Sequence, residues 1–400
     1  MSVAACTIVA KPLLAQARVV ARSIRAHNPG LPVFTLLADE VDGWFEPAAE
    51  PFTLVRLQDL DLPSLPAFRF RHAQQPLSYA CTPGLLAHLL DRGFDRVLFF
   101  KQETMVLDDL GPLLEPLAQA PVVLTPHLPD PLTGPDATAR ELNILLSGVY
   151  NVGVVGVSRH PVARRFLAWW HERVAEACHH DVAGGLHFEQ RWVDLALSFF
   201  EGVRVLRDPT CNIGHWALPD RAITVAGDGL VEVDGRRAVV FRFSGFDPDV
   251  PDAFTRYNQR VGWREAGDAH LVFERFRAAL AAEGLDETRR WPYAYGAFDN
   301  GIPVPDLARQ LYAGLGDAAT RFGDPLVTTG PDSFWRWLTS PAEGVAVPRF
   351  WQAVHDARPD LQQAFPDLTG DGGRRFMAWA RQSGLVEHHV HDALLGSATA

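Results

Sequence analysis

The sequence predicts a mixed α/β fold: a mostly parallel sheet flanked by helices, followed by a helical C-terminal region. Near the N-terminus, apolar strand-like segments alternate with a helical segment, which is typical of parallel strands joined by crossover helices. Further on, Val97 to Phe100 form an unbroken apolar run that ends at Lys101-Gln102-Glu103. Such a run indicates a strand buried on both faces. After about Trp263 the strand pattern stops and helical spacing dominates.

Turn residues and hydrophobic spacing place the individual elements. Expected strands cover 3–10, 32–38, 52–57, 97–100, 122–125, 152–157, 203–206 and 239–243, with a hairpin turn at 233–236. Expected helices cover 13–27, 77–92 (bent at Pro83-Gly84), 110–117, 141–147 and 161–178, then 270–283, 306–322, 333–338, 349–365 and 374–383. The stretch from Asp59 to Gln75 is expected to be an irregular loop. We therefore expect two domains, residues 1–265 and 266–400.

Composition and charge narrow the class of protein. The 400 residues are 47% hydrophobic and 21% charged, which is ordinary for a globular protein. A net charge of −11 argues against nucleic acid as a partner, because phosphate binding needs a basic face. No apolar run approaches the roughly 20 residues that span a membrane, and no signal peptide is visible. Four scattered cysteines fit a reduced compartment. We expect a cytoplasmic protein, with a peripheral position at the inner membrane face as the alternative.

Common catalytic signatures are missing from the chain. It contains no GxGxxG after the first strand, no Walker A loop, no GxSxG elbow and no HExxH. His388, His389 and His391 form either a metal-binding group or a solvated helix end, and no suitably spaced cysteines accompany them. No metal site is therefore predicted.

Several short blocks follow one another along roughly residues 3–260: TIVA, LAQARVVARSI, HLLDRGFDRVLFF, VYNVGVVGVSRHP, FLAWW, FEQRWVD, CNIGHW and FRFSGFDP. In this order they resemble a bacterial GT-A-fold glycosyltransferase of the kind related to family-eight enzymes. The later segments SFWRWL and ARPDLQQAFPD resemble the helical extension of some bacterial members. The resemblance implies a GT-A-like catalytic domain that binds a nucleotide-sugar.

The resemblance also implies a metal site that this chain has replaced. In the family, two aspartates at a strand end and a later histidine hold a divalent cation against the donor diphosphate. Here these positions carry Lys101, Glu103 and Arg242, and Thr82 stands where the family often has a lysine. In one interpretation, the positively charged side chains of Lys101 and Arg242 stabilise the leaving group directly. In the other, the site is degenerate and Glu103 makes a salt bridge with Lys101 or Arg242.

Catalytic roles implied by the resemblance fall on Glu189, Gln190 and Asp247. A carboxylate at Glu189 would orient the acceptor hydroxyl, act as base or stabilise an oxocarbenium-like centre, or it is a helix N-terminal residue favoured by the dipole. Asp247 is expected to face the acceptor. Asp194 is expected near the acceptor or sugar, with local capping as the structural alternative.

The remaining candidates lie at strand ends and in one loop. Asn151 reaches toward the sugar or forms a turn. His215 would contact phosphate or carry a proton, and Trp216 would stack on a sugar, with loop and core roles as alternatives. Ala10 and Lys11, at the first βα junction, should lie near the nucleoside base.

The resemblance thus implies an enzyme that moves a hexosyl or deoxyhexosyl group from a nucleotide-sugar to a hydroxyl of a glycan, protein or small molecule. No cofactor is expected, and Lys101 and Arg242 are predicted to replace the metal. The alternative is a catalytically inactive GT-A-like binding or scaffold protein. An oxidoreductase is disfavoured because the glycine fingerprint is missing. The pattern does not specify an oligomeric state.

Overall fold

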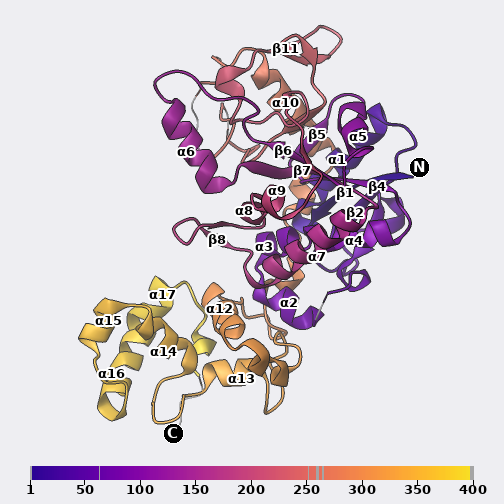
Figure 1. Cartoon of the computed structure of the whole chain (residues 1–400). Helices are drawn as coiled ribbons and strands as arrows, with labels where there is room; N and C mark the ends of the chain where they lie inside the picture. Colours follow the sequence, from indigo (N-terminus) through magenta and orange to yellow (C-terminus); the bar gives the residue numbers. More distant parts are fainter. Residues whose placement is uncertain (1, 63, 251, 258–260, 264, 397–400) are drawn as a thin grey trace. The chain divides into compact units, whose positions relative to one another are not determined.

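A computed structural model describes residues 2–62, 64–250, 252–257, 261–263 and 265–396. The chain forms two compact units (Figure 1). Unit 1 consists of Met1–Leu62 and Gln75–Tyr293, and unit 2 of Pro63–Gln74 and Ala294–Ala400.

A central sheet organises unit 1 and confirms the expected mixed α/β fold. Within the described residues it has seven strands: β1 (Val3–Val9), β2 (Val33–Leu37), β3 (Thr53–Arg56), β4 (Arg96–Phe100), β6 (Val122–Pro126), β7 (Tyr150–Ser158) and β10 (Val203–Val205). Their order is β10-β6-β7-β4-β1-β2-β3. Strand β7 is antiparallel to β4 and β6, and the other neighbours pair in parallel. The carboxyl ends of β4 and β6 therefore meet at one edge of the sheet.

Helices cover the sheet because their apolar stripes match its buried faces. In unit 1 they are α1 (Leu14–His27), α3 (Gln74–Ala80), α4 (Thr82–Asp91), α5 (Gly111–Leu117), α6 (Ala137–Ser147), α7 (Pro161–Glu176), α8 (Gln190–Val193), α9 (Ala196–Phe199), α10 (Ala269–Ala282) and α11 (Leu285–Thr288). Short 3-10 turns are η1 (Lys11–Leu13), η2 (Pro47–Ala49), η3 (Leu57–Asp59) and η4 (Leu218–Asp220). Helix α4 packs beside α7, and α1 beside α10 and α11.

Small strands bring distant segments to the end of β4. Strand β5 (Thr104–Val106) leaves the sheet after the polar triplet and pairs antiparallel with β14 (Val240–Arg242). In this register Arg242 lies opposite Thr104, so its side chain reaches the end of β4. The other hairpins are β8 (His180–Asp181) with β9 (Leu186–His187), and β11 (Ile223–Val225) with β12 (Val231–Val233) and β13 (Arg236–Arg237).

Four local predictions were wrong. The single helices expected at 306–322 and 349–365 are each divided, the first into α12 (Asp306–Gly314) and η6 (Gly316–Phe322), the second into α14 (Arg349–Asp356) and α15 (Pro359–Ala364). The expected loop from Asp59 to Gln75 contains α2 (Leu65–Arg71), and the single helix expected at 77–92 is two helices, α3 and α4, separated at Cys81. Pro83 occupies the first turn of α4, where its missing N–H costs nothing. The proline therefore starts a helix instead of bending one.

Unit 2 is helical, as expected for the C-terminal region, but it also takes in α2. Its other elements are α12 (Asp306–Gly314), α13 (Phe334–Thr339), α14 (Arg349–Asp356), α15 (Pro359–Ala364), α16 (Gly370–Trp379), α17 (Leu385–Glu387), 3-10 turns η5 (Ala294–Gly296), η6 (Gly316–Phe322) and η8 (Asp392–Leu395), and a π-helical turn η7 (Ala380–Gly384). Phe70 of α2 is fully buried and packs edge-on against Tyr312 and Phe334. Arg309 donates to the carbonyls of Phe70 and Tyr295, at 2.6 and 2.7 Å.

The boundary expected between residues 265 and 266 falls inside unit 1. Helix α10 belongs to this unit because its aromatic face covers the strand that carries Arg242. Phe276 stacks on Phe243 with ring centroids 3.9 Å apart, and Phe273 packs edge-on against Phe241. No helix in the described ranges is long and apolar enough to cross a bilayer.

Candidate active site

A cavity of about 410 Å³ opens in unit 1 at the carboxyl ends of β4 and β6. Eight predicted site residues line it: Lys101, Glu103, Asn151, Glu189, Gln190, His215, Trp216 and Arg242. The volume lies in the range of about 300–1,000 Å³ that small-molecule sites usually occupy. Lys101 and Arg242, which are 141 positions apart in sequence, meet at this edge of the sheet.

Lys101 and Glu189 form a buried ion pair in the cavity wall. Lys101 Nζ lies 2.5 Å from Glu189 Oε1, and the two side chains are 11% and 0% exposed. The same ammonium group lies 3.8 Å from the ring centroid of Tyr79. Because Glu189 has no access to solvent, Lys101 supplies the charge that makes its burial tolerable.

Arg242 is 2% exposed and is held by the turn that follows β4. Its Nη1 donates to Thr104 Oγ1 at 2.6 Å and to the carbonyl of Lys101 at 3.3 Å. Burial lowers the pKa of Arg242, and the nearby carboxylates Glu103 and Glu189 oppose that change. A guanidinium remains charged under these conditions, so a fixed cation stands at the cavity wall.

The charges that line the cavity leave a positive excess. Lys101, Arg242 and Arg256 carry positive charge, and Glu103 and Glu189 carry negative charge. Burial raises the pKa of Glu103, while Arg242, Lys101 and Arg256 lower it. The cavity is therefore suited to an anionic ligand.

Gln190 and Asn151 shape the cavity through the backbone. Gln190 Oε1 accepts from the N–H of Val152 at 3.0 Å, and its Nε2 donates to the carbonyl of Ser147 at 2.8 Å. Asn151 Oδ1 accepts from the N–H of Gly153 at 2.6 Å. These bonds fix α8 against β7 and so hold the neighbouring Glu189 in place.

Aromatic residues form part of the cavity wall. The ring of Trp216 packs edge-on against His127 and His215, with centroids 5.0 and 5.3 Å apart. The His215 ring also lies 6.3 Å from that of Tyr257. Burial lowers the pKa of His127 to about 3, so this imidazole is neutral at neutral pH. Such a wall offers apolar faces together with N–H groups, as sugar rings require.

Several buried polar atoms around the cavity make no hydrogen bond within the described part of the chain. They are Glu189 Oε2, Arg242 Nε, Trp216 Nε1, His127 Nδ1 and His187 Nδ1. Each unmet buried group costs about 1–3 kcal/mol, so such a cluster is expected where a ligand supplies the partners. Because the set mixes donors and acceptors, a ligand with several hydroxyl groups would suit it.

Four predicted residues do not line this cavity in the described structure: Ala10, Lys11, Asp194 and Asp247. Lys11 Nζ pairs with Asp42 at 2.8 Å and with Asp39 at 3.4 Å, and the lysine is fully buried. Asp194 accepts from the N–H of Val149 and pairs with Arg191, and Asp247 accepts from the N–H of Asp249 in a tight turn. These contacts give Lys11, Asp194 and Asp247 local structural partners, and Ala10 is fully buried.

Sequence reasoning missed part of the cavity wall. Tyr79 of α3, His127 after β6, His187 of β9 and Arg256 all line it. His127 was detectable, because it directly follows a strand whose end lies on the same edge as that of β4. The other three had no local signal.

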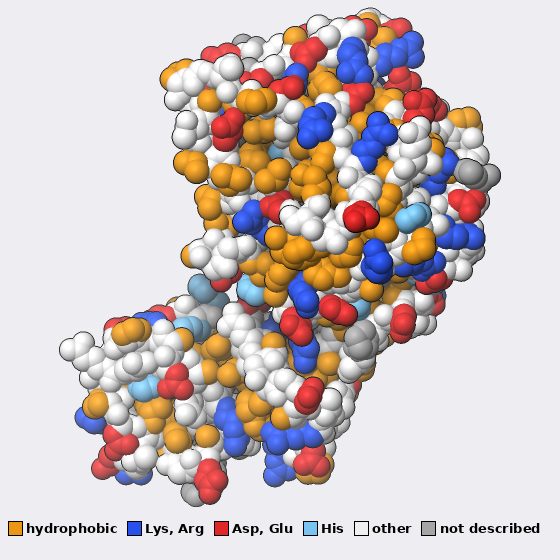
Figure 2. Space-filling view, viewed as in Figure 1, with side chains coloured by type: hydrophobic (Ala, Val, Ile, Leu, Met, Phe, Trp, Pro, Cys, Tyr) orange, Lys and Arg blue, Asp and Glu red, His pale blue; other side chains and the backbone are white. Residues whose placement is uncertain are grey.

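Helix α6 forms one rim of the cavity and carries an exposed apolar face. Asn143, Ile144, Leu146 and Ser147 line the cavity, and Leu142, Leu145 and Leu146 are each more than half exposed. Figure 2 shows hydrophobic side chains gathered along this helix.

The residues at the family's metal positions do not fit a divalent cation. Such a cation needs several oxygen ligands, whereas Lys101 and Arg242 bring positive charge and leave Glu103 as the one carboxylate of the three. Elsewhere, the described residues contain no group of three His, Cys, Asp or Glu side chains that could hold a metal ion. His388, His389 and His391 are included in that finding.

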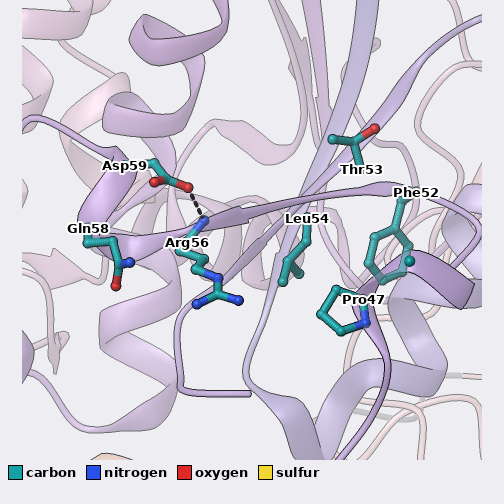
Figure 3. A pocket seen from close by; sticks show the side chains of 8 residues that line it. Pro47, Phe52, Thr53, Leu54, Arg56, Gln58 and Asp59 are labelled. Carbon is teal, nitrogen blue, oxygen red and sulfur yellow. Dashed lines mark hydrogen bonds between the residues drawn. The ribbon is translucent and has the colours of Figure 1, made fainter. Parts of the chain in front are cut away.

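A larger hollow of about 660 Å³ lies beside the edge strand β3 (Figure 3). It is lined by Pro47, Ala48, Phe52, Thr53, Leu54, Arg56, Gln58 and Asp59. Asp59 already accepts from the N–H of Arg56 at 2.8 Å. No predicted site residue reaches this open hollow, so we place the candidate site in the smaller cavity.

Gly153 of β7 allows the Arg242 guanidinium to lie against the backbone. A Cβ at this position would overlap Arg242 Nε and lie 2.6 Å from its Cζ. We expect Gly153→Ala to displace Arg242 from Thr104 and to lower the free energy of unfolding by about 1–3 kcal/mol, as overpacking does. Urea denaturation measures this change.

Gly84→Ala provides the matched control. This residue lies in α4, and the nearest atom to an added Cβ is 3.6 Å away. Alanine has the higher helix propensity, so stability should hold or rise. Equal stability of Gly153→Ala and the unaltered protein would show that the overlap is relieved without moving Arg242.

Comparison with known proteins gives structural likenesses at low sequence identity. No protein-family model matches the chain, and no curated protein is significantly similar to it. The galactosyltransferase LgtC, solved with donor and acceptor sugar analogs, is 15% identical; the match covers 70% of this chain and 96% of that one, with a TM-score of 0.40. The glycosyltransferase GlyE of Streptococcus pneumoniae TIGR4 is 14% identical over 74% and 67% of the two chains, with a TM-score of 0.39. Mouse xyloside xylosyltransferase 1 is 13% identical over 60% and 97%, with a TM-score of 0.38.

Proposed function

We propose that the cavity binds the diphosphate and sugar of a nucleotide-sugar and that the chain transfers the sugar to an acceptor hydroxyl. The observation that carries this proposal is the cluster of buried, unmet donors and acceptors beside a positive excess of charge. The ordered sequence blocks that resemble GT-A glycosyltransferases support it independently.

In this proposal Arg242 receives the negative charge of the departing nucleoside diphosphate. Its Nη1 is held by Thr104 and by the carbonyl of Lys101, so the guanidinium is fixed in the cavity wall. An oriented cation in a site that excludes water stabilises developing charge without reorganising. In the proposal Lys101 contacts both Glu189 and the ligand. Its ammonium group already contacts the Glu189 carboxylate.

Glu189 is the proposed acceptor of the hydroxyl proton. Its Oε1 contacts Lys101, and its Oε2 has no hydrogen-bond partner in the described residues. As the bond from the anomeric carbon to the phosphate oxygen breaks, the acceptor oxygen bonds to that carbon and its proton passes to Glu189. The electron pair leaves with the diphosphate.

A non-catalytic sugar-nucleotide-binding protein is the second candidate. The Lys101–Glu189 ion pair favours it, since each of these two buried side chains already has a structural partner in the other. Both candidates predict donor binding, and only the first predicts transfer.

A donor screen tests the proposal. We expect one member of a set of UDP-, GDP-, dTDP- and CMP-sugars to raise the melting temperature of the protein. A ligand that binds the folded state and not the unfolded state stabilises the folded state. We also expect transfer or hydrolysis of that sugar to continue at an unchanged rate in EDTA, because Lys101 and Arg242 take the place of the cation.

Each result separates the alternatives. Binding without turnover would favour the non-catalytic candidate. No shift with any donor would contradict both. A strict Mn²⁺ requirement would leave sugar transfer standing and remove the metal-independent version of it.

A further inference from the structure

Unit 2 contains a pocket of about 470 Å³ with an unusual balance of charge. Its lining residues are Arg321, Phe322, Pro331, Asp332, Ser333, Arg336, Trp337, Ser340 and Arg349. Three arginines and one carboxylate therefore surround it, in a chain whose net charge is −11. Figure 2 shows Lys and Arg side chains gathered near α13, the helix that carries Arg336.

None of the three pocket arginines forms a salt bridge with a carboxylate in the described residues. Arg349 instead donates to the carbonyls of Trp337 and Ser340, at 3.2 and 3.1 Å. Elsewhere in unit 2, Arg358 pairs with Asp360 at 2.6 Å and with Glu387 at 3.2 Å. The three pocket arginines thus lack the carboxylate partners that Arg358 has.

Proximity of like charges makes this arrangement costly without a counter-ion. Burial lowers the pKa of Arg349, and the positive charge of Arg321 lowers it further. Two guanidinium groups that repel each other are stabilised when an anion lies between them.

Aromatic faces line the same pocket and lie against two of its three arginines. The Arg349 guanidinium lies 5.2 Å from the Trp337 ring centroid, and that of Arg321 lies 4.7 Å from the Phe322 ring centroid. Phe322 and Trp337 pack together, with ring centroids 5.9 Å apart. The walls therefore combine fixed cations with an apolar surface beside them.

We propose that this pocket binds the phosphoryl group of a phosphate monoester, with Arg321, Arg336 and Arg349 contacting its oxygens. Guanidinium groups match phosphate oxygens in geometry and charge. The pocket is much larger than one phosphate, so the organic part of the ester lies against Phe322 and Trp337. This site goes beyond the proposed function and does not depend on it, because all its residues belong to unit 2.

Calorimetric titration of the full chain with inorganic phosphate and with glucose 1-phosphate tests the proposal. We expect both phosphates to bind, glucose 1-phosphate with the higher affinity. Added salt should lower both affinities. Arg321→Gln and Arg336→Gln should each weaken binding about tenfold or more, as expected for the loss of a hydrogen bond to a charged group. Arg375→Gln, at an exposed arginine outside the pocket, is the control and should bind as the unaltered protein does.

Two further arms separate the alternatives. Binding that survives Arg321→Gln with Arg336→Gln but is lost in Arg242→Gln would overturn the proposal, because it would place the anion in the active-site cavity. No binding of either phosphate, together with no sedimentation on vesicles of phosphatidic acid in phosphatidylcholine, would overturn it as well. A third outcome is that the protein binds the vesicles but not soluble phosphate, and that the two substitutions abolish vesicle binding. This would support the site and identify a lipid headgroup as the source of the phosphate.

Discussion

We expect Arg242→Gln to lower kcat/KM for the proposed sugar transfer by roughly 100-fold or more, the usual cost of losing one preorganised charge at a leaving group. The guanidinium is 2% exposed, and Thr104 Oγ1 fixes it at 2.6 Å. Glutamine is uncharged and cannot offer a fork of donors to a diphosphate. The loss should appear mainly in kcat if the contact strengthens in the transition state. Steady-state kinetics with the donor found by thermal shift measure it.

Two companion variants test this interpretation. Arg242→Lys keeps a charge but not the fork geometry, so it should recover only part of the rate. Arg237→Gln removes an arginine that is 64% exposed on the nearby β13 and should leave turnover unchanged. An Arg242→Gln protein with normal kinetics and a normal melting temperature would show that Arg242 does not meet the leaving group.

Replacing Lys101 with methionine lowers the free energy of unfolding by about 3 kcal/mol or more. Glu189 is fully buried, and Lys101 lies 2.5 Å from it, so methionine leaves a buried carboxylate without its counter-charge. A second substitution, Glu189→Gln, should restore most of the lost stability because no unpaired charge then remains. Urea denaturation of the two single variants and the double variant measures the coupling.

The control for Lys101 is a pair on the surface. Arg374 pairs with Asp371, and their side chains are 72% and 87% exposed. Arg374→Met should change stability by less than about 1 kcal/mol, since exposed pairs contribute little. If Lys101→Met is no more damaging than this surface change, Glu189 finds another partner in solution.

The sequence allowed the site edge to be predicted, because its signals are local. Val97 to Phe100 form a buried run, and the polar triplet that begins at Lys101 ends β4 as expected. The block around Arg242 likewise identified a strand whose end reaches the site. The order of blocks then placed Glu189 and Trp216 in the same cavity.

The sequence did not reveal contacts between side chains that are far apart along the chain. Glu189 meets Lys101 because Gln190 bonds to the backbone of β7, and no local pattern encodes that contact over 88 positions. One sequence-based alternative paired Glu103 with Lys101 or Arg242, whereas the carboxylate that reaches Lys101 is that of Glu189, from a distant turn. The wall formed by Tyr79 and His187 depends on tertiary packing in the same way.

Helix α2 was missed for a different physical reason. Its seven residues are too few for a clear helical period, and Phe68 and Phe70 alternate as in a strand. The helix is stable because both rings are buried in unit 2. Packing overrides local preference here.

Because α2 belongs to unit 2, the division of the chain affects how it can be shortened. The polypeptide passes between the units near residues 62, 74 and 293, so the helical unit is not a simple C-terminal addition. A fragment ending at Tyr293 would keep Phe70 but lose Phe298, Tyr312 and Phe334, which surround its ring. Removing the whole helical unit therefore means cutting the chain at two separated places.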